Sequence, residues 1–159
     1  MTRHNLVRNW VFKIAEEALL SPAMEKQGIL GETDKSRRRP GDVSVPCWAN
    51  GKGLAVDVAV VCPLAASHLN EIEPCENYGV GQKHRLYDEG FVRSNYDFVA
   101  MIFETSGGVN DEGESILKQM FRFASKRSLV SHSRFCGRAW ARLSCCLQRA
   151  CAQMVLSIL

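Results

Sequence analysis

Two aspartates in consecutive predicted strands carry the clearest chemical signal in this sequence. Asp42 follows Pro40-Gly41 at the start of one apolar segment, and Asp57 lies among β-branched residues in the middle of the next. A carboxylate inside an apolar strand is unfavourable unless a partner compensates its charge, and two carboxylates on neighbouring strands repel each other. A divalent cation relieves both problems, because hard cations prefer oxygen ligands. The pair therefore predicts a divalent-metal site.

Each of these residues also has a purely structural interpretation, and the sequence leaves it open. Asp42 after Pro-Gly fits an ordinary turn acid, and Asp57 fits a buried salt bridge to Lys83 or Arg85. Lys83 and Tyr87 are four residues apart, so they share one face if this segment is helical. Taken alone, such a lysine is typical of a solvated surface and such a tyrosine of a core.

Hydrophobic periodicity predicts the elements that position these residues. Helical spacing of apolar residues indicates helices, and alternating or continuous apolar runs indicate strands. In chain order we expect a helix over residues 4–20, strands over 24–30, 41–48 and 54–62, an interrupted helical region over 65–87, a strand over 97–103, and helices over 111–127 and 133–158. This order predicts an α/β fold, in which a small mixed sheet is flanked by helices and followed by a C-terminal helical pair.

The second aspartate strand is the predicted centre of the sheet. Residues 54–62 are nearly all apolar, as expected for a strand covered on both faces. Residues 49–53 before it are rich in residues that accept positive φ, which predicts a turn between the two aspartate strands. Because side chains alternate along a strand, Asp57 shares a face with Ala55 and Ala59, whose small side chains leave room beside the carboxylate.

Composition bounds the class of protein. A chain of 159 residues with 46% hydrophobic and 23% charged residues is most simply one globular domain, here residues 1–159. The net charge of +3 gives no general case for nucleic-acid binding, so such a case needs local clusters. Two exist, and they comprise Arg37, Arg38 and Arg39, and then Arg134, Arg138, Arg142 and Arg149, which step along the last predicted helix; the plainest interpretation of that stripe is a solvated face.

The cysteines and histidines give no catalytic or metal-binding pattern. Seven cysteines occur without a C-x-x-C pair, and four histidines are scattered without ligand spacing. The cysteines are typical of a reduced intracellular protein that uses them as small hydrophobes, with the nucleus as one candidate compartment. No apolar run is long enough to cross a membrane.

The order of these motifs resembles the PD-(D/E)xK, or restriction-endonuclease-like, nuclease fold. More narrowly, it is similar to the endonuclease-like region downstream of the reverse transcriptase in some retrotransposon proteins. The resemblance spans residues 4–127 as a nuclease-like core, with 128–159 as a helical extension. The matching pieces are His4-Asn5, Glu25, Arg39-Pro40-Gly41-Asp42, Asp57-Val58-Ala59-Val60, Lys83 with Tyr87, and Phe103-Glu104-Thr105-Ser106-Gly107-Gly108.

The resemblance implies roles for particular residues. It implies that Asp42 and Asp57 hold Mg²⁺, and it places a lysine two residues beyond the second acid, where this chain has Ala59. In some branches of the family the lysine has moved to the following helix, and Lys83 fits that substitution. The family also uses an acid from the first helix, for which Glu16 or Glu17 is a candidate, and Glu25 is the alternative.

Two functions follow from this pattern. The first is a Mg²⁺-dependent DNA endonuclease domain derived from a retrotransposon polyprotein, with DNA held by Arg37, Arg38, Arg39, Arg138 and Arg142. Arginines of this kind contact phosphates and fix position without reading sequence. The alternative is a nuclease-fold remnant that has lost catalysis and acts as a DNA-binding or structural module, which Ala59 in the lysine position favours.

Overall fold

A four-stranded mixed sheet forms the centre of the molecule, in the order β1-β2-β3-β4. The computed structural model describes residues 2–30 and 39–156. β1 pairs antiparallel with β2, β2 antiparallel with β3, and β3 parallel with β4. The strands are β1 (Ala23–Met24), β2 (Val43–Ala49), β3 (Lys52–Val61) and β4 (Tyr96–Glu104).

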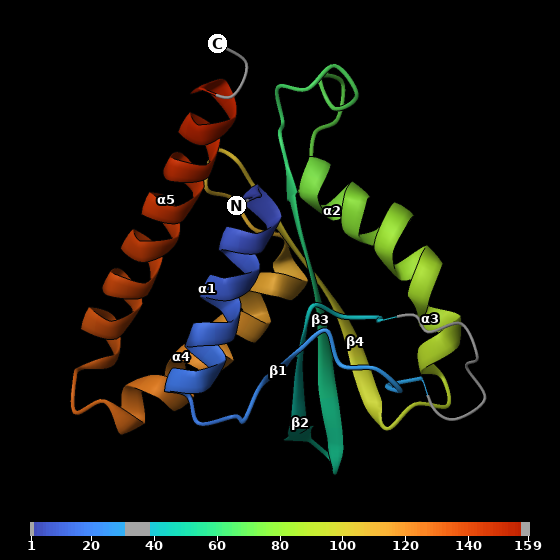
Figure 1. The fold of residues 1–159 in the computed structure, drawn as a ribbon, viewed down its shortest axis with the longest axis vertical. Helices are drawn as coiled ribbons and strands as arrows, with labels where there is room; N and C mark the ends of the chain where they lie inside the picture. The colour runs from blue at the N-terminus through green and yellow to red at the C-terminus, as the bar shows by residue number, and fades with distance from the viewer. Residues whose placement is uncertain (1, 31–38, 157–159) are drawn as a thin grey trace.

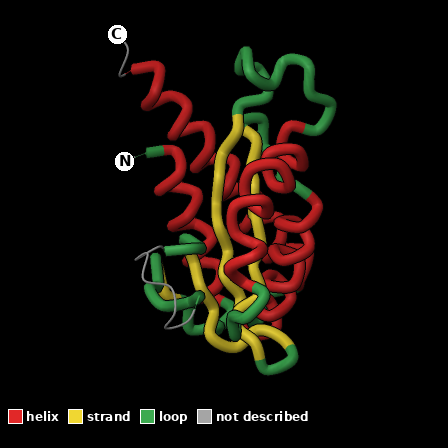
Figure 2. The backbone as a smooth tube through the Cα atoms, turned by 90° about the vertical axis from the view of Figure 1, so that its right-hand side faces the viewer, coloured by secondary structure: helices red, strands yellow, loops and turns green. Residues whose placement is uncertain are grey.

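Helices cover both faces of this sheet, which confirms the predicted α/β class (Figure 1). On one side lie α1, α4 and α5, and on the other lies a continuous helical segment made of α2, a π-helical turn η1, and α3. Figure 2 shows the strands running alongside the helices, and the loop between β3 and α2 extends past the strand ends. The helical bounds are α1 (Arg3–Glu17), α2 (Pro74–Tyr78), η1 (Gly79–His84), α3 (Arg85–Phe91), α4 (Asp111–Arg127) and α5 (His132–Leu156).

Alternation along β3 and β4 divides the core between the two faces, as predicted. Val56 and Val58 of β3 face the main cluster with α1, α4 and α5, whereas Ala55 and Ala59 face the α2–η1–α3 side. The C-terminal pair belongs to this main core, because Phe121 of α4 and four apolar residues of α5 are buried in it. Those four residues are Phe135, Ala139, Leu143 and Leu147.

The turn between the aspartate strands also follows the prediction. Asn50 and Gly51 both have positive φ, 51° and 77°, and they connect Ala49 to its partner Lys52. Positive φ at both central positions defines the tight hairpin turn whose twist matches the flanking strands. The register shifts between Val45 and Ala49, so the turn joins β2 and β3 but does not by itself set the pairing farther along the strands.

Two predicted elements were wrong in part. The strand expected over 24–30 is only Ala23–Met24, and the chain then leaves the sheet, with Glu25 at a φ of 45°. The helical region expected from residue 65 begins at Pro74, because residues 65–73 form turns and bends instead. Gly79 and Gly81 do not break the helix but lie in the π-helical turn.

Among the described residues, none of the helices has the length and apolar character that crossing a membrane requires.

The N-terminal end of α4 completes the outer edge of the sheet. Asn110 Nδ2 donates to the Ala100 carbonyl (2.8 Å), and its Oδ1 accepts from the Ile102 amide (2.9 Å). Glu112 Oε2 accepts from the Ala100 amide (3.1 Å). These side chains satisfy backbone groups of β4 that would otherwise be available to another strand.

We expect Asn110→Ala to lower the free energy of unfolding by about 1 to 3 kcal/mol, because it leaves buried backbone groups of β4 without partners. Asn77→Ala, at an exposed position on α2, is the matched control and should change stability little. Urea denaturation measures both variants. Equal effects would contradict this role for Asn110.

Candidate active site

The pairing of β2 and β3 places the two predicted aspartates opposite each other. Val43 pairs with Val56, so continuing the register by one residue puts Asp42 across from Asp57. Asp42 lies just before β2, and Asp57 lies in the middle of β3, in register with Ala100 of β4. The structure therefore brings together the two carboxylates that the sequence singled out.

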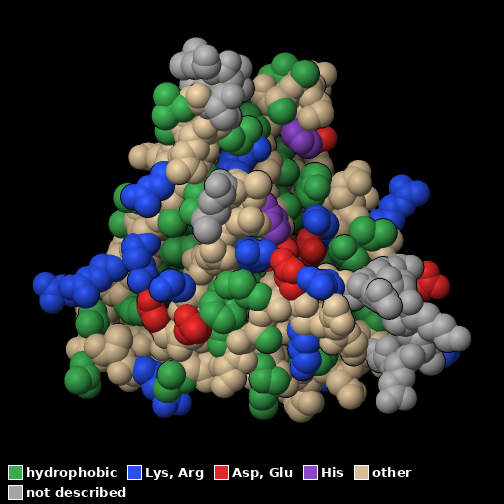
Figure 3. All heavy atoms as spheres, in the orientation of Figure 1, with side chains coloured by type: hydrophobic (Ala, Val, Ile, Leu, Met, Phe, Trp, Pro, Cys, Tyr) green, Lys and Arg blue, Asp and Glu red, His purple; other side chains and the backbone are tan. Residues whose placement is uncertain are grey.

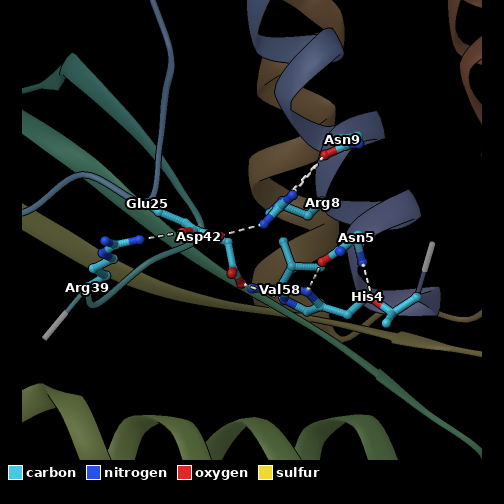
Figure 4. A network of polar contacts seen from close by, with 9 residues as sticks. His4, Asn5, Arg8, Asn9, Glu25, Arg39, Asp42 and Val58 are labelled. Atoms are coloured by element: carbon cyan, nitrogen blue, oxygen red, sulfur yellow. Dashed lines mark hydrogen bonds and ion pairs between the residues drawn. The ribbon is translucent and has the colours of Figure 1, made fainter.

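Asp42 is held by groups from both the sheet and the first helix. Its Oδ2 accepts a hydrogen bond from the backbone amide of Val58 (2.7 Å) and lies 3.0 Å from Nε2 of His4 on α1 (Figure 4). Within the described part of the chain, its other oxygen, Oδ1, makes no hydrogen bond or ion pair. Asp42 is therefore oriented through one oxygen, and the second is left for another ligand.

Asp57 is almost fully buried and meets a single cation. Its side chain lies on the α2–η1–α3 side, and only 6% of the residue is exposed. Nζ of Lys83, from η1, is 2.6 Å from its Oδ2. The ammonium compensates the carboxylate through this close contact and through its charge. The alternative in which Asp57 pairs with Lys83 thus describes the geometry, whereas Arg85 is exposed.

The electrostatics link these residues into one site. Burial raises the pKa of the Asp57 carboxyl, the ion pair with Lys83 opposes this, and the nearby charge of Asp42 adds to the increase. Burial alone would lower the pKa of the Lys83 ammonium, but its contact with Asp57 outweighs burial and the pKa is raised. His4 also acts on Asp57, in the direction that favours the charged carboxylate. The charges of Asp57, Lys83, Asp42 and His4 therefore act on one another, and they come from the sheet, η1 and α1.

Tyr87 lies one helical turn beyond Lys83, as the spacing predicted. Its ring packs against Phe98 of β4, with the two ring centroids 5.2 Å apart, and its charge contributes to the raised pKa of Lys83. Tyr87 therefore combines the two interpretations that the sequence left open, since it packs in a core cluster and also borders the site.

The candidate third acids lie elsewhere. Glu25 Oε1 pairs with Arg8 of α1 (2.7 Å), and Glu25 Oε2 pairs with Arg39 (2.8 Å), so both oxygens are neutralised by arginines (Figure 4). Glu16 and Glu17 are exposed on α1, and Glu17 binds Arg142 of α5 through both oxygens (2.8 and 3.1 Å). The structure thus does not bring any of the three glutamate carboxylates into contact with Asp42 or Asp57.

The predicted nucleic-acid-binding arginines are dispersed. Arg37 and Arg38 lie outside the described residues, and Arg39 is paired with Glu25. Arg138 is exposed on α5, and Arg142 is held by Glu17. On the face seen in Figure 3, lysine and arginine side chains gather over the α5 side of the molecule.

Carboxylate oxygens are the kind of donor that Mg²⁺ prefers, and Asp42 and Asp57 supply two such groups. Among the described residues, no cluster of three or more His, Cys, Asp or Glu side chains is arranged around a common point. Mg²⁺ keeps several waters and commonly takes only one or two protein carboxylates, so a pair of facing aspartates is sufficient. Asp42 and Asp57 would hold the ion, with Oδ1 of Asp42 as the open ligand.

Sequence reasoning missed the residues that support this site. His84, next to Lys83, lies between Asp88 and Glu112, with its Nδ1 and Nε2 each 2.8 Å from a carboxylate oxygen. The i,i+4 spacing of His84 and Asp88 was a local signal for half of this arrangement. The contact with Glu112 joins segments 28 residues apart, which no local pattern indicates.

Comparison with known proteins adds no family assignment. No protein-family model matches the chain, and no curated protein matches it either.

Removing the cation beside Asp57 should strongly destabilise the fold. We expect Lys83→Met to lower the free energy of unfolding by roughly 3 to 5 kcal/mol at neutral pH, because a buried carboxylate is left without its partner. Lys83 opposes the rise in the pKa of Asp57 that burial causes, so the pKa of Asp57 should be higher still in Lys83→Met. The loss should therefore shrink as the pH falls through the pKa of Asp57 in the variant, where the buried carboxylate takes up a proton and loses its charge.

Lys52→Met provides the matched control for this experiment. Lys52 pairs with Asp97 at 3.0 Å, but both side chains are about half exposed, and such surface pairs contribute under about 1 kcal/mol. Chemical denaturation of both variants over a series of pH values makes the comparison. Similar losses in the two variants would mean that Asp57 does not depend on Lys83.

Proposed function

We propose that this chain is a Mg²⁺-dependent DNA endonuclease domain of the PD-(D/E)xK type, derived from a retrotransposon reverse-transcriptase polyprotein. The observation that supports it most directly is the juxtaposition of Asp42 and Asp57 on neighbouring strands, with Lys83 at 2.6 Å from Asp57. The order Asp42, Asp57, Lys83 also follows the order of the family's motifs.

The proposed chemistry is hydrolysis of a phosphodiester. A carboxylate-bound Mg²⁺ supplies a water of lowered pKa and stabilises negative charge on the phosphate. Asp42 and Asp57 would bind and orient the ion. Lys83, held in a largely buried position, would contribute a fixed positive charge beside the attacking water, where low exposure strengthens its effect.

Arginines on α5 would hold the nucleic acid. Arg138 is exposed and faces solvent, whereas Arg142 must share its charge with Glu17. Contacts of this kind neutralise phosphates without reading the bases, so the proposal predicts binding that falls with salt and shows little sequence preference.

Plasmid nicking tests the catalytic proposal. Wild-type protein with Mg²⁺ should convert supercoiled plasmid to the open circular form, and Asp57→Asn and Asp42→Asn should each reduce the rate at least about a hundredfold. Asp97→Asn is the matched control, since it removes an exposed carboxylate that also pairs with a lysine, and it should retain full activity. Nicking by Asp57→Asn at the wild-type rate, in protein shown to be folded by circular dichroism, would refute the proposal.

One observation favours the non-catalytic alternative. The lysine position two residues beyond Asp57 is occupied by Ala59, and the Asp57 carboxylate is already matched by Lys83 in a buried pair. On this alternative the chain binds DNA without cleaving it, and the aspartates serve only the fold.

DNA binding at increasing salt separates the two functions. Under the alternative, fluorescence anisotropy with a labelled duplex should show binding that Asp57→Asn leaves unchanged, whereas replacing Arg138 and Arg142 with glutamine should weaken it and reduce its salt dependence. If replacing Arg138 and Arg142 left the affinity for DNA unchanged, DNA would not be the partner of the α5 surface.

A further inference from the structure

We infer that His84 is a positioning residue for Lys83: clamped as an imidazolium between Asp88 and Glu112, it holds η1 in the geometry that sets Lys83 against Asp57. Its effect on catalysis rests on the proposed function, whereas its effect on the Lys83 side chain does not. His84 and Lys83 are consecutive residues at the end of η1, so the backbone that carries one also carries the other.

The contacts of His84 define its protonation state. Nδ1 is 2.8 Å from Oδ1 of Asp88 on α3, and Nε2 is 2.8 Å from Oε2 of Glu112 on α4. An ionised carboxylate only accepts hydrogen bonds, so both ring nitrogens must donate, and they do so together only in the protonated ring. A neutral His84 can keep at most one of these two contacts.

The two carboxylates that face His84 favour its protonated form. The charged groups that face the ring are Asp88 and Glu112, and from β4 the neutral ring of Phe98 meets it edge-on, with centroids 5.3 Å apart. Burial by itself lowers the pKa of His84, but the hydrogen bonds to the two carboxylates outweigh burial and raise it above 6.5. Glu112 is fixed in turn, because the same oxygen accepts from the Ala100 amide.

The π-helical turn explains why Lys83 needs such a clamp. A π-helix is rare and usually occurs as a single turn within an α-helix, frequently at functional sites. At its start, Gly79 is buried against Ala100 and Ile102 of β4, where a Cβ would lie 3.6 Å from Ile102 Cγ1. At its end, His84 ties the turn to the beginning of α4. Between these points Val80 is 66% exposed, and the contact of Lys83 with Asp57 ties the segment to β3.

The position of Lys83 should depend on pH, because His84 keeps both of its carboxylate contacts only while it is protonated. Below its raised pKa, His84 is charged and makes both contacts, and Lys83 is held against Asp57. As the pH rises through that pKa, the ring loses one proton and one contact, and the end of η1 loosens. Lys83 should then be less well placed, although its own pKa is raised above 10.5 and it remains charged.

Nuclear magnetic resonance of Lys83 tests the inference without DNA or metal. In protein labelled with ¹³C at the lysine side chains, the Cε signal of Lys83, assigned by its loss in Lys83→Met, should shift with the same midpoint as the His84 ring. In His84→Arg, which keeps a charge that does not titrate, that inflection should disappear. His68→Gln is the matched control, because His68 also contacts a carboxylate, Glu71 at 3.0 Å, but lies outside η1; the inflection should persist in it.

Glu112→Gln provides a second variant that retains an acceptor while removing the charge. It should move the inflection of Lys83 to lower pH, together with the pKa of His84. A Lys83 signal that titrates identically in wild type, His84→Arg and Glu112→Gln would overturn the inference.

Plasmid nicking over the same pH range links the clamp to activity. We expect wild-type nicking to fall as the pH rises through the pKa of His84, the fall to be absent in His84→Arg, and Glu112→Gln to lose about tenfold. Suppose that Asp57→Asn loses nicking, but His84→Arg and Glu112→Gln show the same dependence of nicking on pH as the wild type. This result would overturn the inference about His84 and leave the proposed function standing. An inactive wild-type protein would contradict the proposed function, and the resonance of Lys83 would still decide the clamp.

Discussion

The buried ion pair between Asp57 and Lys83 is the interaction on which the rest of this structure depends. Asp57 lies in the middle of a strand that is covered on both faces, so its carboxylate is largely shielded from bulk water. One ammonium at 2.6 Å compensates it, and that ammonium must come from the helical segment across the same face. A buried ion pair is often no more stabilising than a hydrophobic pair of the same volume. The presence of this pair is therefore not by itself evidence that it stabilises the fold.

The same region of the fold that completes the sheet also supports the lysine. Asn110 and Glu112, at the beginning of α4, satisfy the backbone of β4 at Ala100 and Ile102. Glu112 also binds His84, next to Lys83. The edge of the sheet and the position of the site lysine are therefore set by the same few side chains, and a change at Glu112 should affect both.

Elements with a strong periodic pattern could be predicted from the sequence. The bounds of α4 and the hairpin between β2 and β3 were predicted because apolar spacing and positive-φ turn residues act locally. The short β1 was not, because the apolar content of 24–30 indicated a longer strand, whereas the chain turns away at Glu25. The π-helical turn was not predicted either, because the sequence indicated only an interrupted helical region over these residues.

The candidate site was predictable in part for the same reason. An aspartate within an apolar strand is visible in the sequence, and strand register then places Asp42 opposite Asp57. The neutralisation of Glu25 by Arg8 and Arg39, and the clamp on His84, depend on contacts between distant segments. Contacts between segments far apart in the sequence produce no periodic pattern of residues, so they can be identified only from the structure.

Anomalous diffraction from crystals grown with Mn²⁺, a substitute for Mg²⁺ with strong anomalous scattering, tests the central claim most directly. The account predicts one ion between Asp42 and Asp57, about 2 Å from an oxygen of each carboxylate, with Lys83 beside it. A map with no ion there, and with Lys83 alone facing Asp57, would contradict it.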